Sequence, residues 1–403
     1  MLLENKKIGI LVTGGIAAYK VTELVRQLIK KQARVRVMMT DSATKFITPL
    51  TLQVLSKEEV IVDTFSENHP ENVQHIEFAQ WCDAAILAPA TANILGKLAN
   101  GIADDVVSTT LLALTCPVVI APAMNDKMFH HPAVSRNLDC LQKDGYRVIS
   151  PETGFLAEGY EAVGRMPAVE VLIHQLEREL AKIIYPQVLE NKCVIVTAGG
   201  TKERIDPVRF ISNDSSGKMG EALALMALYL GANVTLITTK QPSIMTDGMD
   251  ILSVSSAVDM YQAIDQVFEA SNYLVMAAAV SDFRMKDISP HKIKKEGSDV
   301  TWHLTKNPDI IKHFAEKKKE QVVIGFAAET DQVVDYARKK LKAKNLDWII
   351  ANDVSRKDAG FNVDQNQVTI LGSQGQESLV PLMSKIKVAE QIWSAVLDLD
   401  LRG

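Results

Sequence analysis

Apolar runs and amphipathic stretches alternate along this chain, and the alternation predicts strands and helices in turn. In the first half, near-continuous apolar runs predict strands at residues 8–12, 35–39, 84–88 and 118–121. The last two runs stop at a proline, and helices are expected at 17–31, 91–99, 105–114 and 168–181. Apolar strands that alternate with helices are typical of a parallel sheet covered on both faces.

The second half repeats this alternation. It predicts strands at 194–197, 234–238, 273–277, 322–326 and 348–350, and helices at 218–230, 257–270, 308–319 and 333–344. A short linker with Pro186 at 183–191 separates the halves. We therefore expect an α/β protein of two domains, 1–190 and 191–403, each a mainly parallel sheet flanked by helices.

Both halves open with the same type of segment, KIGILVTGG at 7–15 and KCVIVTAGG at 192–200. Glycines after a buried strand let the backbone approach a phosphate, and the next helix directs its amides at the anion. Gly14 and Gly15 lack the full G-x-G-x-x-G spacing, so a tight strand–helix turn explains them equally well. The second strand ends at Thr40, which suits a monophosphate better than the ribose of a dinucleotide. Two such openings indicate two nucleotide-type sites.

Composition and charge exclude several protein classes. The net charge of −5 over 403 residues gives no general attraction to nucleic acid or anionic membranes. No apolar run approaches the ~20 residues of a membrane helix. The N-terminal MLLENKK leaves no room for a signal peptide, and the four cysteines form no CxxC pair. We expect a cytoplasmic protein without membrane or nucleic-acid partners.

A series of motifs runs through both halves in a fixed order. The first half carries GGIAAYK, HIEFAQW, APATAN, GIADDVVST, PAMN and GRM. The second carries TAGGTKERIDPVRFISNDSSGKMG, AAAVSDF, KIKK, KNPDI, GFAAET and KNLDWIIANDV. In these motifs, over nearly its whole length, the chain resembles the bacterial bifunctional phosphopantothenoylcysteine decarboxylase/phosphopantothenate–cysteine ligases of coenzyme A biosynthesis.

For the first half, the resemblance implies a flavoprotein-type, Rossmann-like domain that decarboxylates 4′-phosphopantothenoylcysteine to 4′-phosphopantetheine with FMN. Oxidation of the thiol by the flavin provides the electron sink that loss of CO2 requires. The implied FMN contacts are Gly14, Gly15, Thr40, Thr91 and Ser108. The resemblance also makes His75 the base and Asn125, with Met124, the group that holds the substrate carboxylate. Without it, a local hydrogen bond of His75 and a turn at Asn125 would be the simpler explanations.

For the second half, the resemblance implies a Rossmann-like ligase that joins 4′-phosphopantothenate to cysteine through an acyl-cytidylate, using CTP and Mg2+. Asn213 would act on the acyl-cytidylate, and Asp282 would bind the metal. The implied CTP residues are Met276, Ala277, Ala278, Asp282, Lys292, Pro308, Asp309, Ile310, Ile311, Phe326, Lys340 and Lys344. Lys292 would also be catalytic. Lys340 and Lys344 lie one helical turn apart, although lysines on a solvated face would show the same spacing.

One position departs from the family pattern. The family has a cysteine in A-C-G on a flap before G-x-G-R-M, whereas this chain has Glu158 in LAEG. We hypothesise that Glu158 is the replacement acid, kept protonated when the closed flap desolvates it. A solvent-facing residue without a role is the alternative.

Three further expectations depend on the resemblance or compete with it. The resemblance implies a homo-oligomer, with trimers of the first half, dimers of the second and a dodecamer if both operate. An active ligase with a silent flavin domain, serving assembly or regulation, is an alternative favoured by Glu158. A nicotinamide oxidoreductase is another, but no Asp or Glu stands at the tip of the second strand, where such enzymes bind the ribose.

Overall fold

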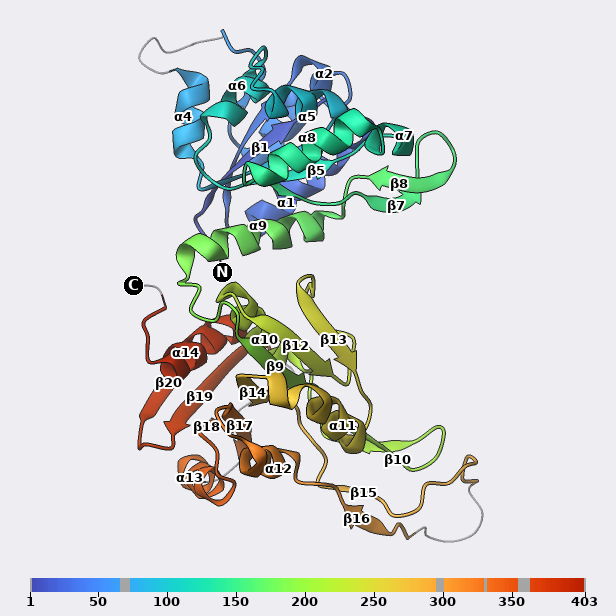
Figure 1. Cartoon of the computed structure of the whole chain (residues 1–403), viewed down its shortest axis with the longest axis vertical. Coiled ribbons are helices and arrows are strands. Elements are labelled where there is room, and N and C mark those ends of the chain that lie inside the picture. Colours follow the sequence, from blue (N-terminus) through green and yellow to red (C-terminus); the bar gives the residue numbers. More distant parts are fainter. Residues whose placement is uncertain (1, 66–72, 295–300, 330–331, 354–362, 402–403) are drawn as a thin grey trace. The chain divides into compact units, whose positions relative to one another are not determined.

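The computed structural model describes residues 2–65, 73–294, 301–329, 332–353 and 363–401. The chain forms two compact units, Met1–Ile184 and Tyr185–Gly403 (Figure 1). The second unit begins a few residues before position 190, because the intervening segment packs within it. Tyr185 donates a hydrogen bond to Glu390 over 2.9 Å, and the Leu189 amide donates to the Leu230 carbonyl over 3.0 Å.

The first unit is built on a six-stranded sheet in the order β3-β2-β1-β4-β5-β6, with every pairing parallel, as predicted. Its strands are β1 (Lys7–Val12), β2 (Arg34–Met39), β3 (Val60–Ile61), β4 (Ala84–Ala90), β5 (Val118–Pro122) and β6 (Arg147–Val148). The prediction that β4 stops before Pro89 is wrong, since the strand continues to Ala90. Its pairing with β5 shifts register between Leu87 and Ala90, which accommodates a proline that has no amide N–H.

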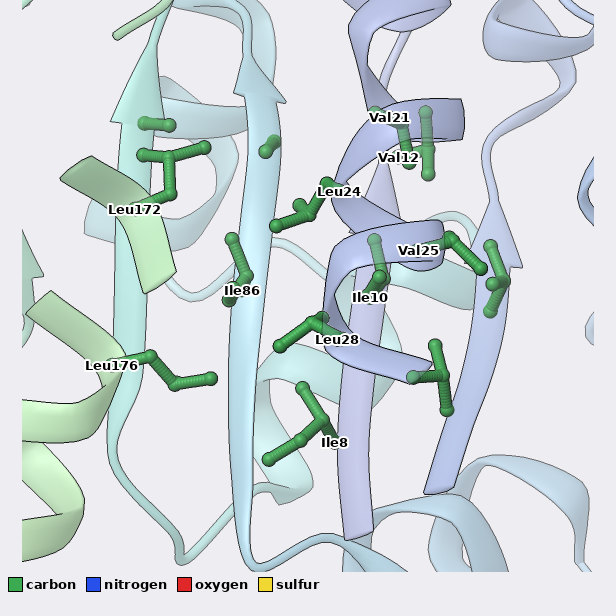
Figure 2. Packing of buried hydrophobic residues seen from close by; sticks show 14 of the residues in the cluster. Ile8, Ile10, Val12, Val21, Leu24, Val25, Leu28, Ile86, Leu172 and Leu176 are labelled. Carbon is green, nitrogen blue, oxygen red and sulfur yellow. The ribbon is translucent and has the colours of Figure 1, made fainter. Parts of the chain in front are cut away.

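Helices cover both faces of this sheet. One face carries α1 (Val21–Lys30), α3 (Pro49–Ser56) and α9 (Val169–Ile184), and the other carries α4 (Gln74–Trp81), α5 (Ala92–Ala99), α6 (Val106–Ala113) and α8 (Pro132–Lys143). The helix expected at 17–31 begins as a 3-10 turn, Ile16–Lys20, before α1. Figure 2 shows Leu24 and Leu28 of α1 packed by Ile10 and Ile86 of the sheet, and Leu172 of α9 belongs to the same buried cluster. Burying each such side chain contributes roughly 1.5–3 kcal/mol.

The second unit has an eight-stranded sheet in the order β13-β12-β9-β14-β17-β18-β19-β20. The strands are β9 (Cys193–Ala198), β12 (Asn233–Thr238), β13 (Met249–Ser253), β14 (Tyr273–Met276), β17 (Val322–Glu329), β18 (Trp348–Asp353), β19 (Gln365–Gly372) and β20 (Glu377–Ser384). Pairings from β13 to β18 are parallel, and β19 and β20 add an antiparallel edge. The prediction of a mainly parallel sheet is confirmed.

Helices again form two outer layers. Helices α10 (Lys218–Tyr229) and α14 (Lys385–Leu397) pack together on one face, where the Trp393 indole donates to the Leu223 carbonyl. The other face carries α11 (Ala257–Val267), α12 (Ile310–Lys317) and α13 (Val333–Ala343). None of the helices in the described chain combines the length and apolar content that a membrane crossing requires.

Two short antiparallel ladders extend the second unit. They are β10 (Lys202–Arg204) with β11 (Phe210–Ser212), and β15 (Phe283–Met285) with β16 (Leu304–Lys306). β10 and β15 contact each other, and in Figure 1 these strands project away from the large sheet. We call this extension the arm.

Candidate active sites

The first candidate site lies at the carboxyl ends of β1, β2 and β4. The sheet order reverses between β1 and β4, and parallel α/β sheets bind ligands at such a reversal. Gly14 and Gly15 follow β1, Thr40 follows β2 and Thr91 follows β4. The structure therefore places four of the five predicted FMN residues at one edge.

Close packing explains the first glycine of this edge. A Cβ on Gly14 would lie 2.5 Å from the Ser42 Cβ, whereas one on Gly15 would make ordinary contacts with the Thr91 methyl group at 3.7 Å and Pro89 Cγ at 3.8 Å. Thr13, which sequence reasoning missed, links the two turns. Its hydroxyl donates to the Pro89 carbonyl over 2.6 Å, and the Thr91 amide donates back to it over 3.3 Å. The β1 and β4 turns are thus held together before any ligand binds.

Helix caps already use several of the predicted FMN hydroxyls. Thr40 accepts from the Ala43 amide over 3.2 Å, and Thr91 accepts from the Ile94 amide over 3.4 Å at the start of α5. Side chains that cap helices leave neighbouring amides pointing outward, which is the arrangement a phosphate requires.

Ser108 is committed to a different contact. It is fully buried in the capping box of α6, where its amide donates to Asp105 over 2.8 Å and its hydroxyl accepts from the Asp105 amide over 3.1 Å. Burial raises the pKa of Asp105, but Lys97 at 2.7 Å and the Ser108 contacts outweigh it and hold that pKa below its usual value. FMN contact through Ser108 stays a prediction that competes with this cap.

His75 is the second residue of α4, as predicted for a residue at a helix start. Its Nδ1 atom is buried and has no hydrogen-bond partner among the described residues. A buried polar atom without a partner is rare in native proteins, so a ligand or another polypeptide is the expected partner.

Asn125 and Glu158 lie within hydrogen-bond distance of each other. The flap is the hairpin of β7 (Glu152–Phe155) and β8 (Glu161–Arg165). The Asn125 amide nitrogen donates to Glu158 Oε1 over 2.9 Å and to the Tyr160 hydroxyl over 2.8 Å. Glu158 is exposed here, so this conformation does not desolvate its carboxyl group.

Two residues of this cluster were missed by sequence reasoning. The Tyr160 hydroxyl donates to Asp126 Oδ1, which lowers the pKa of Asp126 and raises that of Tyr160. Tyr160 stands two residues after Glu158, and Asp126 directly follows Asn125. Their closeness in sequence to Glu158 and Asn125 was the signal that could have identified these two residues. Together the four side chains form a polar cluster between the flap and the turn after β5.

The second candidate site is a cavity of about 920 Å³ in the second unit. It lies at the carboxyl ends of β14 and β17 and at the N-termini of α10 and α12. Its lining includes Asn213 and the predicted CTP residues Met276, Ala277, Ala278, Asp282, Pro308, Asp309, Ile310, Ile311, Phe326, Lys340 and Lys344. The structure therefore assembles residues that are spread over more than a hundred positions of sequence.

Hydrogen bonds and an ion pair hold several of the side chains that line the cavity in place. Asp309 caps α12 by accepting from the Lys312 amide, and Lys344 neutralises it at 3.0 Å. Asn213 donates to the Val280 carbonyl over 3.1 Å. Among the described residues, no group of three His, Cys, Asp or Glu side chains could hold a metal. Asp282, the predicted Mg2+ ligand, lines the cavity together with Asp214 and Asp309, and Mg2+ at a nucleotide needs only one or two carboxylates besides the phosphates.

Lys292 is the exception among the predicted CTP residues. It is exposed on the arm and is absent from the described lining of the cavity. The neighbouring Ile293 amide is tied to Asp206 over 3.1 Å, and the Ser289 amide to the Ile205 carbonyl over 3.0 Å. These contacts hold the segment against the β10–β11 turn, and the structure does not bring Lys292 together with the other residues.

The cavity also contains polar groups that sequence reasoning missed. Ser281 Oγ and Asn352 Oδ1 are buried there without a hydrogen-bond partner in the described part of the chain. Lys385 lines the cavity with 6% exposure, and burial, followed by the nearby Lys218 charge, lowers its pKa to about 8. No motif marks Lys385, whereas Asn352 belongs to the IIANDV segment.

Comparisons with known proteins agree for both units. A family model described as "Flavoprotein" matches residues 2–181, and one described as "DNA/pantothenate metabolism flavoprotein C-terminal domain" matches 189–399. The curated protein "Coenzyme A biosynthesis bifunctional protein CoaBC" of Bacillus subtilis strain 168 is 48% identical, covering 97% of this chain and 96% of that protein. The proteins of that name from Haemophilus influenzae and Escherichia coli K12 are 41% and 40% identical, covering 99% and 96% of this chain and 98% and 95% of theirs. The chain belongs to the CoaBC family of bifunctional coenzyme A biosynthesis proteins.

Proposed function

We propose that the second unit joins 4′-phosphopantothenate to cysteine with CTP, and that the first unit decarboxylates the product with FMN to give 4′-phosphopantetheine. The observation that carries the ligase assignment is the cavity, which gathers Asn213 and every predicted CTP residue except Lys292.

The ligase reaction proceeds in two steps, activation of the carboxylate by CTP and attack by the cysteine amine. The carboxylate of 4′-phosphopantothenate attacks the α-phosphorus of CTP, an O–P bond forms, and pyrophosphate leaves. The cysteine amine then attacks the acyl carbon, a C–N bond forms, and CMP leaves as the amine loses its proton. Lys340 and the N-termini of α10 and α12 stabilise the phosphate charge. Asp282 would hold Mg2+, which when bound would supply further positive charge to the phosphates. Asn213 binds the acyl-cytidylate, with Phe326 and the backbone of 276–278 beside cytosine.

The residues of the first unit fit an FMN phosphate. Gly14 leaves no space for a Cβ atom, and the capped N-terminus of α5 lies beside it through Thr13 and Thr91. Gly14, Gly15, Thr40 and Thr91 would hold the group, and Ser108 would join them if its cap opened. When bound, FMN supplies the two-electron oxidation and reduction that make decarboxylation of a cysteine possible.

The side chains around this site supply proton transfer and substrate binding. His75 accepts the thiol proton, since its buried Nδ1 has no hydrogen-bond partner among the described residues and the ring is available for this role. Asn125 binds the substrate carboxylate through the amide nitrogen that now binds the Glu158 carboxylate. Glu158 then donates the proton that completes 4′-phosphopantetheine.

The decarboxylase site is assembled between copies of the chain. Figure 1 shows α4, which carries His75, and the β7–β8 flap on opposite sides of the first unit. One chain therefore does not bring His75 to Asn125, which supports the trimer of first units implied by the sequence. Dimers of the second unit would extend it to a dodecamer. The four unpaired cysteines favour a reducing, cytoplasmic location.

Product analysis tests both assignments. The purified protein is incubated with 4′-phosphopantothenate, cysteine, CTP and Mg2+, and the products are identified by mass. We expect CMP, pyrophosphate, CO2 and 4′-phosphopantetheine. Formation of 4′-phosphopantothenoylcysteine without CO2 from FMN-loaded protein would instead mean that the flavin unit is silent, and absence of the amide would exclude the ligase.

A further inference from the structure

Asp206 is the most densely hydrogen-bonded carboxylate described in the arm. Its side chain is fully buried. Oδ1 accepts from the Val208 amide over 2.8 Å and from the Arg209 amide over 2.7 Å. Oδ2 accepts from Arg209 Nε over 3.0 Å, from Arg209 Nη2 over 2.6 Å and from the Ile293 amide over 3.1 Å.

The two oxygens have different tasks. Oδ1 closes the local turn between β10 and β11, which is an ordinary role for an aspartate. Oδ2 binds a segment more than eighty residues away in sequence, and the Arg209 guanidinium completes this link by donating to the Ile293 carbonyl over 2.5 Å. Both backbone polar groups of Ile293 are thus held by the Asp206–Arg209 pair.

The electrostatic state of Asp206 supports a permanent clamp. Burial alone would raise the pKa of this carboxyl group. The amides of Val208, Arg209 and Ile293, together with the Arg209 guanidinium, outweigh burial and hold the pKa well below its usual range. The carboxylate therefore stays charged at any working pH of the enzyme.

The clamp joins two parts of the proposed ligase machinery. Lys292 directly precedes the clamped Ile293, while β11 runs from Arg209 into Asn213 at the cavity. Backbone contacts hold the other end of the β10–β11 hairpin, where the Thr201 amide donates to the Ala279 carbonyl over 3.3 Å. One hairpin thus connects the cavity to the segment that carries Lys292.

We propose that Asp206 is a positioning residue of the ligase, which fixes the backbone beside Lys292 relative to Asn213 through Oδ2 and Arg209. The proposal rests on the proposed role of Lys292 in CTP activation. Lys292 is exposed and is not among the described residues that line the cavity. Its position therefore depends on its backbone, which the clamp on the next residue fixes. Small displacements of a catalytic group cost up to roughly 100-fold in rate.

Asp206→Asn tests this with little change of shape. An asparagine oxygen can still accept the turn amides in place of Oδ1, but its NH2 group cannot accept from Arg209 or Ile293. We expect kcat for acyl-cytidylate formation to fall on the order of 10- to 100-fold, with a much smaller change in KM for CTP. The matched control is Asp265→Asn, which removes the exposed ion pair at 2.7 Å between Asp265 of α11 and Lys317 of α12. This variant should retain full activity.

A double-variant cycle separates positioning from a general structural effect. If Asp206 acts through Lys292, Asp206→Asn should change kcat little in a Lys292→Gln protein. An equal loss in both backgrounds would overturn the proposal, as would wild-type kcat in the single Asp206→Asn variant. Normal ligation by Lys292→Gln would instead overturn the proposed role of Lys292, and the two failures are therefore distinguishable.

Trypsin cleavage gives a readout that does not depend on activity. Lys292 and Lys294 flank the clamped residue and are exposed. In the folded Asp206→Asn variant, cleavage after these lysines should accelerate at least several-fold, because a released backbone fits a protease better. Unchanged cleavage, with thermal unfolding equal to wild type, would show that Asp206 does not hold this segment.

Discussion

Individual side chains at both candidate sites are already committed to neighbours before a substrate binds. Asn125 donates to Glu158 and Tyr160, and Lys344 is paired with Asp309. A substrate must therefore exchange these contacts for its own, and the exchange is nearly neutral in energy only where the substrate group resembles the group it displaces. A carboxylate that replaces Glu158 on Asn125 meets this condition.

Glu158→Gln isolates the proton-donor role. Glutamine retains an oxygen that can accept from Asn125, but it cannot act as an acid. We expect CO2 release to continue while the product stays two hydrogens lighter than 4′-phosphopantetheine, as detected by mass. Ligation serves as the internal control, since Glu158 lies in the other unit. Wild-type yield of 4′-phosphopantetheine at the wild-type rate would remove Glu158 from the mechanism.

Lys385 makes nucleotide binding depend on pH. Its pKa is lowered to about 8, first by burial and then by Lys218. An ammonium at the cavity attracts phosphate only while it is protonated, so CTP affinity should decrease as the pH rises through about 8. Lys385→Arg, which stays charged, should lose this pH dependence but retain affinity at high pH. Binding curves for both proteins from about pH 7 to pH 9.5 check this.

The Lys385 charge affects stability in the opposite direction from CTP binding. This difference allows a loss of binding at high pH to be distinguished from unfolding. Its folded-state pKa lies below that of the unfolded chain, so the unfolded state binds more protons between the two values. Burial of the charged ammonium therefore costs stability below about pH 8, and this cost disappears as the pH rises. Weaker CTP binding with unchanged or higher stability at alkaline pH would identify the binding effect, whereas pH-independent affinity would contradict it.

At the level of elements, long apolar runs were predictable and short polar ladders were not. The strands of both sheet centres are buried on both faces, so continuous hydrophobic segments marked them. β19, next to the edge strand β20, alternates buried and less buried positions, and β10, β11, β15 and β16 are three-residue strands in polar segments. Three residues are too few to show the alternation of apolar and polar positions that identifies a strand.

The candidate sites show the same limit. Motifs located most cavity residues because these residues follow a strand or start a helix, and the carboxyl edge of a parallel sheet brings such positions together. The same reasoning did not work for Lys292, because this residue lies on the arm, whose path depends on contacts with Asp206. The place of Lys385 in the cavity depends on tertiary packing that no local pattern encodes.

The docking of the flap depends on Gly164. Its φ is +155°, and a Cβ there would approach the Met124 carbonyl oxygen to 2.1 Å, where the Met124 amide also donates to the Gly164 carbonyl over 3.0 Å. Gly164→Ala should displace the flap and lower CO2 release on the order of 10-fold or more, without affecting ligation. Gly145→Ala is the control, since Gly145 also has a positive φ but meets no atom within 4 Å in the described structure. Equal CO2 release by the two variants would show that flap docking is not required.

At the level of the whole molecule, each unit has its own core and its own candidate site. Separate cores allow the two reactions to be disabled one at a time. In the first unit, however, α4 and the flap lie on opposite sides (Figure 1). The proposed mechanism therefore requires two copies of the chain to bring His75 and Asn125 to one substrate.

Complementation between variants tests this assembly. His75→Asn and Asn125→Asp should each abolish CO2 release, because each lacks one half of every site, while both retain ligation. Co-expressed in equal amounts, they should form mixed oligomers in which about a quarter of the interfaces pair a native His75 with a native Asn125, and CO2 release should return to that level. The purified variants mixed without exchange of subunits are the control and should stay inactive. If the co-expressed proteins form mixed oligomers but release no CO2, both residues act within one chain, and the shared site proposed here is wrong.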